Sequence, residues 1–371
     1  MTSEMTQILR VGILGCGEVA QVVHIPTLTN LPDLFTVSYL YDISPAAMKH
    51  CQSRVLADGP PRLAKDMDEL VSSPEVDIVF ILSSDEYHAE FAVKALQQDK
   101  HVFVEKPMAL SNRDADLIIQ AERKSQGRVC VGYMRRHAAA FVDALREVGG
   151  LSEIVYARVR DIIGPNSTFV GQSGMHSIKF GDDISEEDRL DLERRSTEIV
   201  AQALENEVQV PVTKENINMW RMLGTLGSHD LSAMREILGM PRKVLGAKIG
   251  SPFWSALFDY GKFAVTYESG IDQIARFDAH IEVYSNTKSV RVVYDTPFVK
   301  GLPVTLVIRE NLEDDPGAYQ ERTIRRTYED PYTLQAKTLY SDIINDVPHK
   351  TSAADARLDL EIYRQILAAA N

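Results

Sequence analysis

The sequence predicts a two-domain α/β protein that begins with a doubly wound parallel sheet. The chain has 371 residues, which is more than a single hydrophobic core usually supports. An apolar run at residues 8–14 leads directly into the pattern G-x-G-x-x-A at residues 15–20, where a strand turns into a helix. Short apolar strands then alternate with helical patterns as far as Val131, as in successive parallel βαβ units.

The glycine turn is the first element that carries chemistry. In a dinucleotide-binding unit Gly15 allows the tight turn, Gly17 lets the backbone approach a pyrophosphate, and Ala20 lets the helix pack on the strand. The N–H groups at the start of that helix then hold the phosphates. A βα turn without a ligand can have the same letters, so the motif needs partners elsewhere. Cys16 is interpreted as a small buried residue rather than as a reactive thiol.

The second strand, at residues 35–41, ends on Asp42. An acidic side chain at this position accepts hydrogen bonds from an adenosine ribose diol, and it repels a 2′-phosphate, which favours NAD. Lys49 and Arg54 are close enough in sequence to keep NADP open. The alternative interpretation of Asp42 is a turn residue that opens the sequence Asp-Ile-Ser-Pro.

Two further strands bring polar residues to the same edge of the sheet. Ser83 and Ser84 follow the strand at 76–82 and precede a helix at 85–98, at the carboxyl end where such sheets bind ligands. The strand at 101–104 runs directly into Glu105, Lys106 and Pro107. A lysine acts as a base near neutral pH only where burial or a nearby positive charge lowers its pKa, and an oxidised nicotinamide ring would do both. A solvated lysine paired with Glu105 is the alternative.

A helix capped by Ser111 and a sixth strand at 128–131 are expected to complete this sheet. The second half of the chain contains many strands in succession with few helices between them, which indicates an antiparallel sheet with one covered face. The expected strands are residues 151–160, 244–250, 253–260, 262–267, 275–284, 289–294 and 303–309. Helices are expected at 332–345 and 353–369, the latter returning toward the first domain.

A polar insertion at residues 161–218 contains a predicted helix at 186–205 that Ser185 caps. Three interpretations remain open for it: a lid over the substrate pocket, a contact between subunits, or a solvated helix with no role beyond packing.

Composition excludes several classes of protein. The net charge of −13 argues against nucleic-acid binding, which requires a basic face. No apolar run is long enough to cross a bilayer, residues 1–7 lack the features of a signal peptide, and the cytoplasm is therefore expected. Cys16, Cys51 and Cys130 show no metal-binding spacing, and no metal site is expected.

Taken together, the glycine loop, Asp42, residues 84–88, residues 98–109 and residues 132–136 resemble the glucose–fructose oxidoreductase, inositol dehydrogenase and rhizopine-catabolism family. The resemblance extends over nearly the whole chain. It implies an NAD(P)-binding Rossmann domain at residues 1–134, and a substrate-binding and oligomerisation domain with a large, open, mostly antiparallel sheet at 135–371. It also implies that Lys106 reaches both the nicotinamide ribose and the substrate hydroxyl. The expected cofactor-binding residues are Gly15, Cys16, Gly17, Glu18, Val19, Asp42, Ser83, Ser84, His88, Glu105 and Lys106.

The segment at residues 220–230 resembles the part of the family in which an aspartate precedes a histidine by one helical turn. His229 matches the histidine, but Thr225 stands at the position of the aspartate. Residues four apart share a helix face, so Thr225 can hydrogen-bond the substrate or orient His229, although it carries no charge. Without the flanking match, His229 would be interpreted as a core or capping histidine. Tyr133, Arg135 and Trp220 are candidate pocket walls, with ordinary packing as the alternative.

These residues predict an NAD(P)-dependent oxidoreductase that acts on a secondary alcohol or ketone of a sugar, cyclic polyol or sugar derivative. His229 is expected to act as general base and Lys106 to stabilise the developing alkoxide, or the two roles are exchanged. A homodimer or homotetramer through the open sheet is also expected. A non-catalytic dinucleotide-sensing protein of the same fold and an NAD-dependent glycoside-cleaving enzyme are the alternatives.

Overall fold

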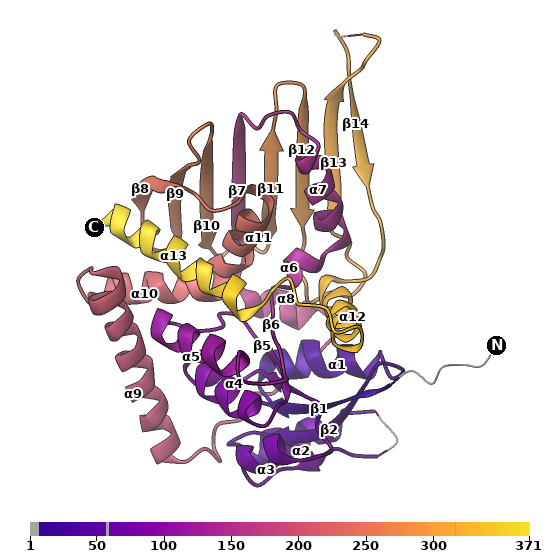
Figure 1. Cartoon of the computed structure of the whole chain (residues 1–371), viewed down its shortest axis with the longest axis vertical. Coiled ribbons are helices and arrows are strands. Elements are labelled where there is room, and N and C mark those ends of the chain that lie inside the picture. Colours follow the sequence, from indigo (N-terminus) through magenta and orange to yellow (C-terminus); the bar gives the residue numbers. More distant parts are fainter. Residues whose placement is uncertain (1–6, 57–58, 316) are drawn as a thin grey trace, which may run out of the picture. The chain divides into compact units, whose positions relative to one another are not determined.

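The computed structural model describes residues 7–56, 59–315 and 317–371, and it divides into two compact units. Unit 1 holds the chain up to Gly132 together with Met175–Ala203 and Gln335–Leu360. Unit 2 holds Tyr133–Gly174, Leu204–Leu334 and Glu361–Asn371. Of residues 1–7, on which the absence of a signal peptide was argued, only Gln7 is described. Figure 1 labels the elements of both units.

Unit 1 is built on a six-stranded parallel sheet in the order β3-β2-β1-β4-β5-β6. Its strands are β1 (Leu9–Leu14), β2 (Phe35–Tyr41), β3 (Arg62–Leu63), β4 (Ile78–Ile81), β5 (His101–Val104) and β6 (Val129–Val131). The strand order reverses between β1 and β4, and ligands bind at such a switch point, outside the carboxyl ends of the strands. The predicted parallel doubly wound sheet is therefore confirmed.

The helical elements of unit 1 connect these strands. They are η1 (Ala20–His24), α1 (Ile25–Thr29), α2 (Pro45–Gln52), α3 (Met67–Ser72), η2 (Asp85–Tyr87), α4 (His88–Gln97), α5 (Asn112–Glu122) and α9 (Glu186–Gln202). The Ser111 and Ser185 side chains cap α5 and α9 as predicted, each accepting a hydrogen bond from the N–H group three residues on. Two helices near the end of the chain, α12 (Pro331–Ile344) and α13 (Ala353–Ala370), contribute residues to both units.

The core of unit 1 lies along both faces of β1 and its neighbours, which explains why these strands are apolar runs. Val11 and Ile13 of β1 are completely buried, and the Phe80 and Phe103 rings stack with centroids 4.6 Å apart. Leu339 and Tyr340 of α12 join the same cluster. This rigid core fixes the carboxyl ends of β1, β2, β4 and β5, which position the candidate site.

Unit 2 is built on an eight-stranded sheet in the order β14-β13-β12-β11-β7-β10-β9-β8, which Figure 1 shows as one row. Its strands are β7 (Tyr156–Ile163), β8 (Lys243–Lys248), β9 (Phe253–Asp259), β10 (Ala264–Ile271), β11 (Phe277–Tyr284), β12 (Lys288–Tyr294), β13 (Thr305–Asn311) and β14 (Tyr319–Ile324). Among the strand pairs described for this second sheet, the β7–β10 pair is parallel and the others are antiparallel. The large, mostly antiparallel sheet is confirmed.

One face of this sheet is covered and the other is open. In β9, Trp254, Ala256 and Phe258 are buried, whereas the alternate residues between them are exposed. The helical elements of this unit are α6 (Met134–His137), α7 (Ala139–Gly149), α8 (Asn166–Gln172), η3 (Ala203–Val208), α10 (Lys214–Met222), η4 (Leu223–Gly227) and α11 (Ser228–Leu238).

Several predicted boundaries were wrong. The strand predicted at 151–160 begins only at Tyr156, because the polar Ser152 and Glu153 lie in an irregular segment before it. The strand predicted at 262–267 begins at Ala264, because Gly261, with φ of +83°, makes the hairpin turn. The helix predicted at 186–205 ends at Gln202, and a π-helical turn follows it. Within the described ranges, no helix is long and apolar enough to span a bilayer.

Candidate functional site

The glycine turn after β1 has the geometry of a phosphate-binding loop. Gly15 has φ of +100°, and a Cβ atom there would lie 2.7 Å from the carbonyl carbon of Leu82, so only glycine fits. At Gly17 a Cβ atom would meet nothing within 4 Å, which leaves open space beside the backbone. The helix begins at Glu18, so its first N–H groups border this space. The residues present therefore fit a dinucleotide pyrophosphate.

Asp42 connects the glycine turn to the end of β2. Its carboxylate accepts hydrogen bonds from the N–H groups of Cys16, at 2.7 Å, and Ser44, at 2.8 Å. Burial raises the pKa of Asp42, although the two N–H groups act against that rise. Its contact with an adenosine ribose stays a prediction. Besides opening a turn, Asp42 is bonded to the glycine loop itself.

Cys16 and Gln21 are buried residues that support the glycine turn. The hydrogen bond with Cys51 and burial raise the pKa of the Cys16 thiol, which agrees with its interpretation as an unreactive buried residue. The buried Gln21 amide donates a hydrogen bond of 2.9 Å to the Cys16 carbonyl. Val19 is half-buried at the start of the helix, and the backbone N–H of Gln21 donates to the Gly17 carbonyl.

Glu105 is buried and paired with a histidine. Its Oε1 lies 2.8 Å from Nε2 of His24, and both side chains are less than one-tenth exposed. Burial alone would raise the pKa of Glu105, but the hydrogen bond and charge of His24 lower it. The carboxylate also accepts from the Lys106 N–H at 3.2 Å, and Gly132 leaves room for it, since a Cβ atom there would lie 3.1 Å away. Glu105 is therefore a buried group that fixes the backbone at Lys106, which does not match the solvated ion pair weighed as an alternative.

His88 joins the two loops that follow β4 and β5. Its Nδ1 lies 2.8 Å from the Pro107 carbonyl oxygen, and its Nε2 lies 3.1 Å from the Ser83 carbonyl oxygen. The ring is buried, whereas Ser83 is half-buried and Ser84 is exposed. His88 thus positions the loop that carries Lys106, and its proposed contact with the cofactor stays a prediction.

In unit 2, Arg135 is the centre of a buried charge cluster. Its guanidinium lies 3.1 Å from Asp161 and 2.5 Å from Asp230, with the Phe277 and Tyr294 rings 5.5 and 5.2 Å from it. Asp230 directly follows His229 on α11, so this cluster fixes the start of the helix that carries the candidate base. Tyr133 is buried beneath the Arg136 guanidinium.

Thr225 and His229 are both half-buried, in a region where most neighbouring residues are buried. Thr225 lies in a π-helical turn, η4, and its hydroxyl donates to the Arg221 carbonyl at 2.9 Å. Such turns often occur at functional sites. Trp220 is buried with its ring edge-on to Tyr363. Lys106 belongs to unit 1 and His229 to unit 2, and their meeting at one substrate stays a prediction.

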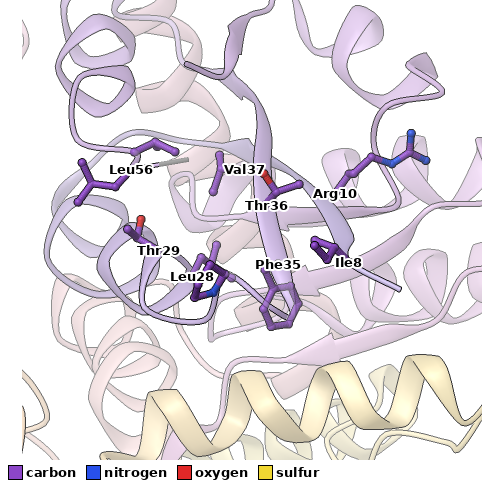
Figure 2. A pocket seen from close by; sticks show the side chains of 10 residues that line it. Ile8, Arg10, Leu28, Thr29, Phe35, Thr36, Val37 and Leu56 are labelled. Atoms are coloured by element: carbon purple, nitrogen blue, oxygen red, sulfur yellow. The ribbon is translucent and has the colours of Figure 1, made fainter. Parts of the chain in front are cut away.

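Other features lie away from this site. Figure 2 shows a cavity of about 670 Å³ at the beginnings of β1 and β2, the opposite end of those strands from the glycine turn. Across the residues that the structure describes, no cluster of three or more His, Cys, Asp or Glu side chains is arranged to hold a metal ion.

Sequence reasoning missed His24 and Gln21, because neither belongs to a spacing motif. Both lie on the helix after the glycine turn, facing inward. Their burial among apolar residues of that helix is the signal that was available, since buried polar groups need partners.

Comparison with known proteins finds similar chains. A family model described as an oxidoreductase family with an NAD-binding Rossmann fold (GFO_IDH_MocA) matches residues 9–133. Myo-inositol 2-dehydrogenase from Thermotoga maritima is 22% identical over 356 residues, covering 95% of this chain and 93% of that protein. Inositol 2-dehydrogenase from Salmonella typhimurium is 33% identical over 138 residues, only 36% of this chain and 39% of that protein.

Two solved structures share the fold over nearly the whole chain. A levoglucosan dehydrogenase in complex with NADH and levoglucosan has a TM-score of 0.71 at 14% identity, covering 98% of this chain and 97% of that one. A 3-ketoreductase from Actinomadura kijaniata in complex with NADP has a TM-score of 0.69 at 15% identity, with 98% of both chains covered. At these identities the likeness concerns the fold alone.

Proposed function

We propose that this chain, of which residues 9–133 match the oxidoreductase family with an NAD-binding Rossmann fold, transfers a hydride between nicotinamide and a secondary alcohol or ketone of a sugar, cyclic polyol or sugar derivative. The names of its relatives support this substrate class, since inositol and levoglucosan are both cyclic compounds that carry secondary hydroxyl groups.

One observation carries the proposal. Lys106 follows β5 at the same carboxyl edge of the sheet as the open Gly17 turn, and the buried Glu105–His24 pair fixes its backbone there. A solvated lysine would not need a buried carboxylate and a buried histidine behind it. These contacts support our proposal that the Lys106 side chain lies beside the bound dinucleotide.

When bound, the nicotinamide supplies the hydride acceptor or donor, and the protein supplies position and proton transfer. In the oxidising direction His229 accepts the proton of the substrate hydroxyl as general base. The Lys106 ammonium donates a hydrogen bond to the same oxygen and stabilises the negative charge that develops on it. Thr225, on the helix face of His229, orients the ring or the substrate, and Tyr133, Arg135 and Trp220 support the pocket walls.

The kinetic test begins with a broad panel of sugars and cyclic polyols, incubated with NAD⁺ and NADP⁺, in which formation of the reduced nicotinamide identifies a substrate. Lys106→Met and His229→Ala are then expected to lower kcat by roughly 100-fold or more, while NADH binding stays nearly unchanged. Lys124→Met, an exposed lysine after α5, is the control and is expected to retain full activity. Wild-type turnover by either active-site variant would contradict the mechanism.

The same panel separates the alternatives. A dinucleotide-sensing protein would bind NADH and turn over none of the compounds. A glycoside-cleaving enzyme would release an aglycone with no net NADH.

We also propose that the open face of the unit 2 sheet joins copies of this chain in a homodimer or homotetramer. Phe253 and Leu257, on the open face of β9, are 45% and 37% exposed, which places apolar area on the uncovered side of a large sheet. Leu257→Arg is expected to shift the mass measured by light scattering toward the monomer. Leu117→Arg on α5, a leucine outside the sheet that is 49% exposed, is the control. A wild-type protein that is monomeric at all concentrations would refute this assembly.

We further propose that the protein is located in the cytoplasm. The three buried cysteine thiols support a reducing compartment, and fractionation of cells tests the location.

A further inference from the structure

Part of the insertion packs on the dinucleotide-binding unit. We call Met175–Ala203, which groups with unit 1, the strap. It contacts three loops at the carboxyl edge of the parallel sheet: the helix after β1, the start of α2 after β2, and η2 after β4. These are the loops that border the glycine turn and Asp42.

The first contact joins the strap to the glycine turn. The Gln21 side chain donates to the Ile178 carbonyl at 3.0 Å and accepts from the Ile178 N–H at 2.8 Å, in addition to its bond with the Cys16 carbonyl. Phe180 packs on the core of unit 1, with its ring centroid 5.4 Å from that of His50. This end of the strap is therefore held by a buried amide and an aromatic side chain.

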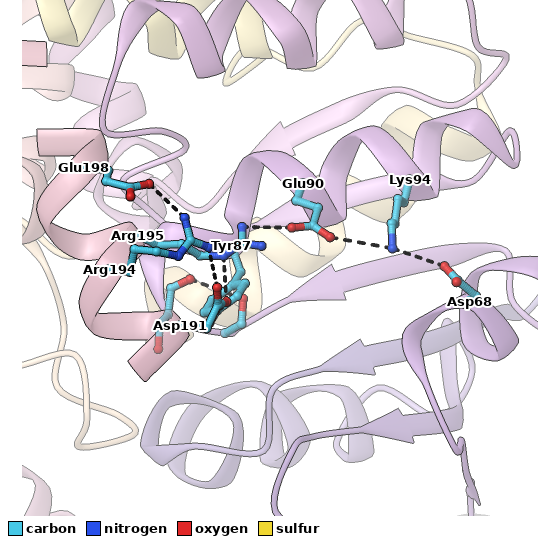
Figure 3. Close-up of polar contacts among 10 residues, drawn as sticks. Asp68, Tyr87, Glu90, Lys94, Asp191, Arg194, Arg195 and Glu198 are labelled. Atoms are coloured by element: carbon cyan, nitrogen blue, oxygen red, sulfur yellow. Dashed lines mark hydrogen bonds and ion pairs between the residues drawn. The ribbon is translucent and has the colours of Figure 1, made fainter. Parts of the chain in front are cut away.

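The third contact joins α9 to η2 and α4, as Figure 3 shows. The Tyr87 hydroxyl donates to Asp191 at 2.8 Å, and burial and this hydrogen bond raise the pKa of Tyr87 to about 12. Arg195 lies over the Tyr87 ring, 4.7 Å from its centroid, and pairs with Glu90 at 2.9 Å. With both ends held, the middle of the strap has little freedom to leave the edge of the sheet.

That middle part places Asp183 at the start of α2. The Asp183 carboxylate accepts from the Ala46 N–H at 2.9 Å and from the Ser44 hydroxyl at 2.8 Å. Ser44 uses its N–H group for Asp42 and its hydroxyl for Asp183, so the two carboxylates share one residue. These bonds to Ala46 and Ser44 lower the pKa of Asp183, so it is negatively charged at neutral pH.

In a Rossmann unit the acidic residue at the end of the second strand faces the 2′-hydroxyl of the adenosine ribose. A 2′-phosphate would therefore lie beside Asp42, next to the first turn of α2, where free N–H groups would otherwise bind it. Here the N–H of Ala46 already donates to Asp183, and that of Ala47 donates to Ser44 Oγ. These two N–H donors are therefore already occupied, and the negative charge of Asp183 adds to that of Asp42.

Of the two cations that kept NADP open, Arg54 is engaged elsewhere. Arg54 lies after the end of α2, where its guanidinium donates at 2.8 Å to the His176 carbonyl of the strap. Lys49 is exposed one turn into α2. We propose, on the basis of the function proposed above, that Asp183 is a specificity-determining residue, contributed by the strap, that excludes the 2′-phosphate of NADP and restricts the enzyme to NAD.

The test is a binding titration of the purified full chain, followed by the fluorescence of NADH and of NADPH, which needs no substrate. Wild type is expected to bind NADPH at least about tenfold more weakly than NADH. Asp183→Asn keeps the shape and the hydrogen-bonding oxygen but removes the charge. Because Asp183 is exposed and screened by solvent, the variant is expected to tighten NADPH binding by about three- to tenfold and to change NADH binding by less than about twofold.

Asp182→Asn is the matched control, because it removes the same charge from the adjacent exposed residue, and it is expected to leave the ratio of the two affinities unchanged. Equal effects of the two variants would reduce Asp183 to one charge among many and overturn the proposal. So would a wild-type preference for NADPH. Wild type that binds neither dinucleotide would instead refute the function proposed above, and this inference with it.

Discussion

Arg135 stands against two buried carboxylates, Asp161 and Asp230, and a single cation balances only one of them. Burial raises the pKa of Asp230 well above its usual range, and the nearby Asp161 adds to that rise despite the opposing charge of Arg135. The guanidinium lies closer to Asp230, at 2.5 Å, than to Asp161, at 3.1 Å. Arg135 is therefore the group that offsets the negative charge of this buried cluster.

The cluster predicts unequal costs for three substitutions. Arg135→Met leaves two buried carboxyl groups without a cation and is expected to lower the free energy of unfolding by about 3–5 kcal/mol. Asp161→Asn and Asp230→Asn each leave one carboxylate beside the guanidinium, so each should cost only about 1 kcal/mol. Urea unfolding of the three variants measures these differences, and a loss for Arg135→Met no larger than that for either asparagine variant would show that the cation does not hold the cluster together.

The sequence predicted Arg135 as a candidate pocket residue but gave no indication of this cluster. Its partners are separated from it by 26 and 95 residues, and no local spacing links them. The same holds for the pairing of His24 with Glu105. Gly15, Gly17 and Asp42 were predictable because a contiguous motif and a nearby strand end define them.

At the scale of the element, the two glycines of the turn are expected to have different roles: Gly15 affects stability and Gly17 affects cofactor binding. Gly15→Ala places a side chain at φ of +100° and against the Leu82 carbonyl, so the variant is expected to lose about 2 kcal/mol of stability or more. Gly17→Ala meets no atom within 4 Å, so its unfolding free energy should change by less than about 0.5 kcal/mol. Its added methyl group nevertheless enters the open space in which we propose that the pyrophosphate binds.

Chemical denaturation and NADH titration of the same two proteins check this prediction. Gly17→Ala should bind NADH at least about tenfold more weakly than wild type, while its free energy of unfolding stays nearly that of wild type. If Gly17→Ala bound NADH normally, the open space at Gly17 would not be the phosphate site.

Helices and strands were predictable from the sequence where a single local pattern defines them. The parallel strands read as apolar runs because both of their faces are buried, and β2 and β5 have the predicted bounds. In contrast, β14 was missed because five of its six residues are exposed and its apolar alternation is absent. Ser185 predicted the start of α9, but not that the strap packs on unit 1, since tertiary packing of a polar segment has no local signature.

At the scale of the whole molecule, the alternation of strands and helices predicted the α/β class, and the helix predicted to return toward the first domain has its residues up to Leu360 in unit 1. The grouping of the other distant segments came only from the structure. Unit 1 combines residues from three separate parts of the chain. Nothing in the sequence indicates that residues near 180 and near 340 join the core that begins at Leu9. Such long-range assembly depends on side-chain packing, which periodicity does not encode.

Buried histidines connect the stability of both units to pH. Burial lowers the pKa of His101, with additional repulsion from His349 and Arg128, and burial likewise lowers the pKa of His349 and of His280. A histidine whose pKa is lower in the folded chain is neutral in both states above about pH 6.5, the unfolded value. Below that pH the unfolded chain binds more protons than the folded chain, so the free energy of unfolding decreases as the pH is lowered.

Thermal unfolding is therefore expected to be nearly independent of pH from about 8 to 7 and to shift to lower temperature between about pH 6.5 and 5, before the carboxylates with lowered pKa values, such as Glu105, become protonated. His101→Gln removes one of the titrating groups and should flatten this dependence. The exposed His176, replaced by glutamine, should leave it unchanged. A melting temperature that stays constant down to pH 5, or an equal flattening by the His176 variant, would mean that the buried rings do not take up protons on unfolding.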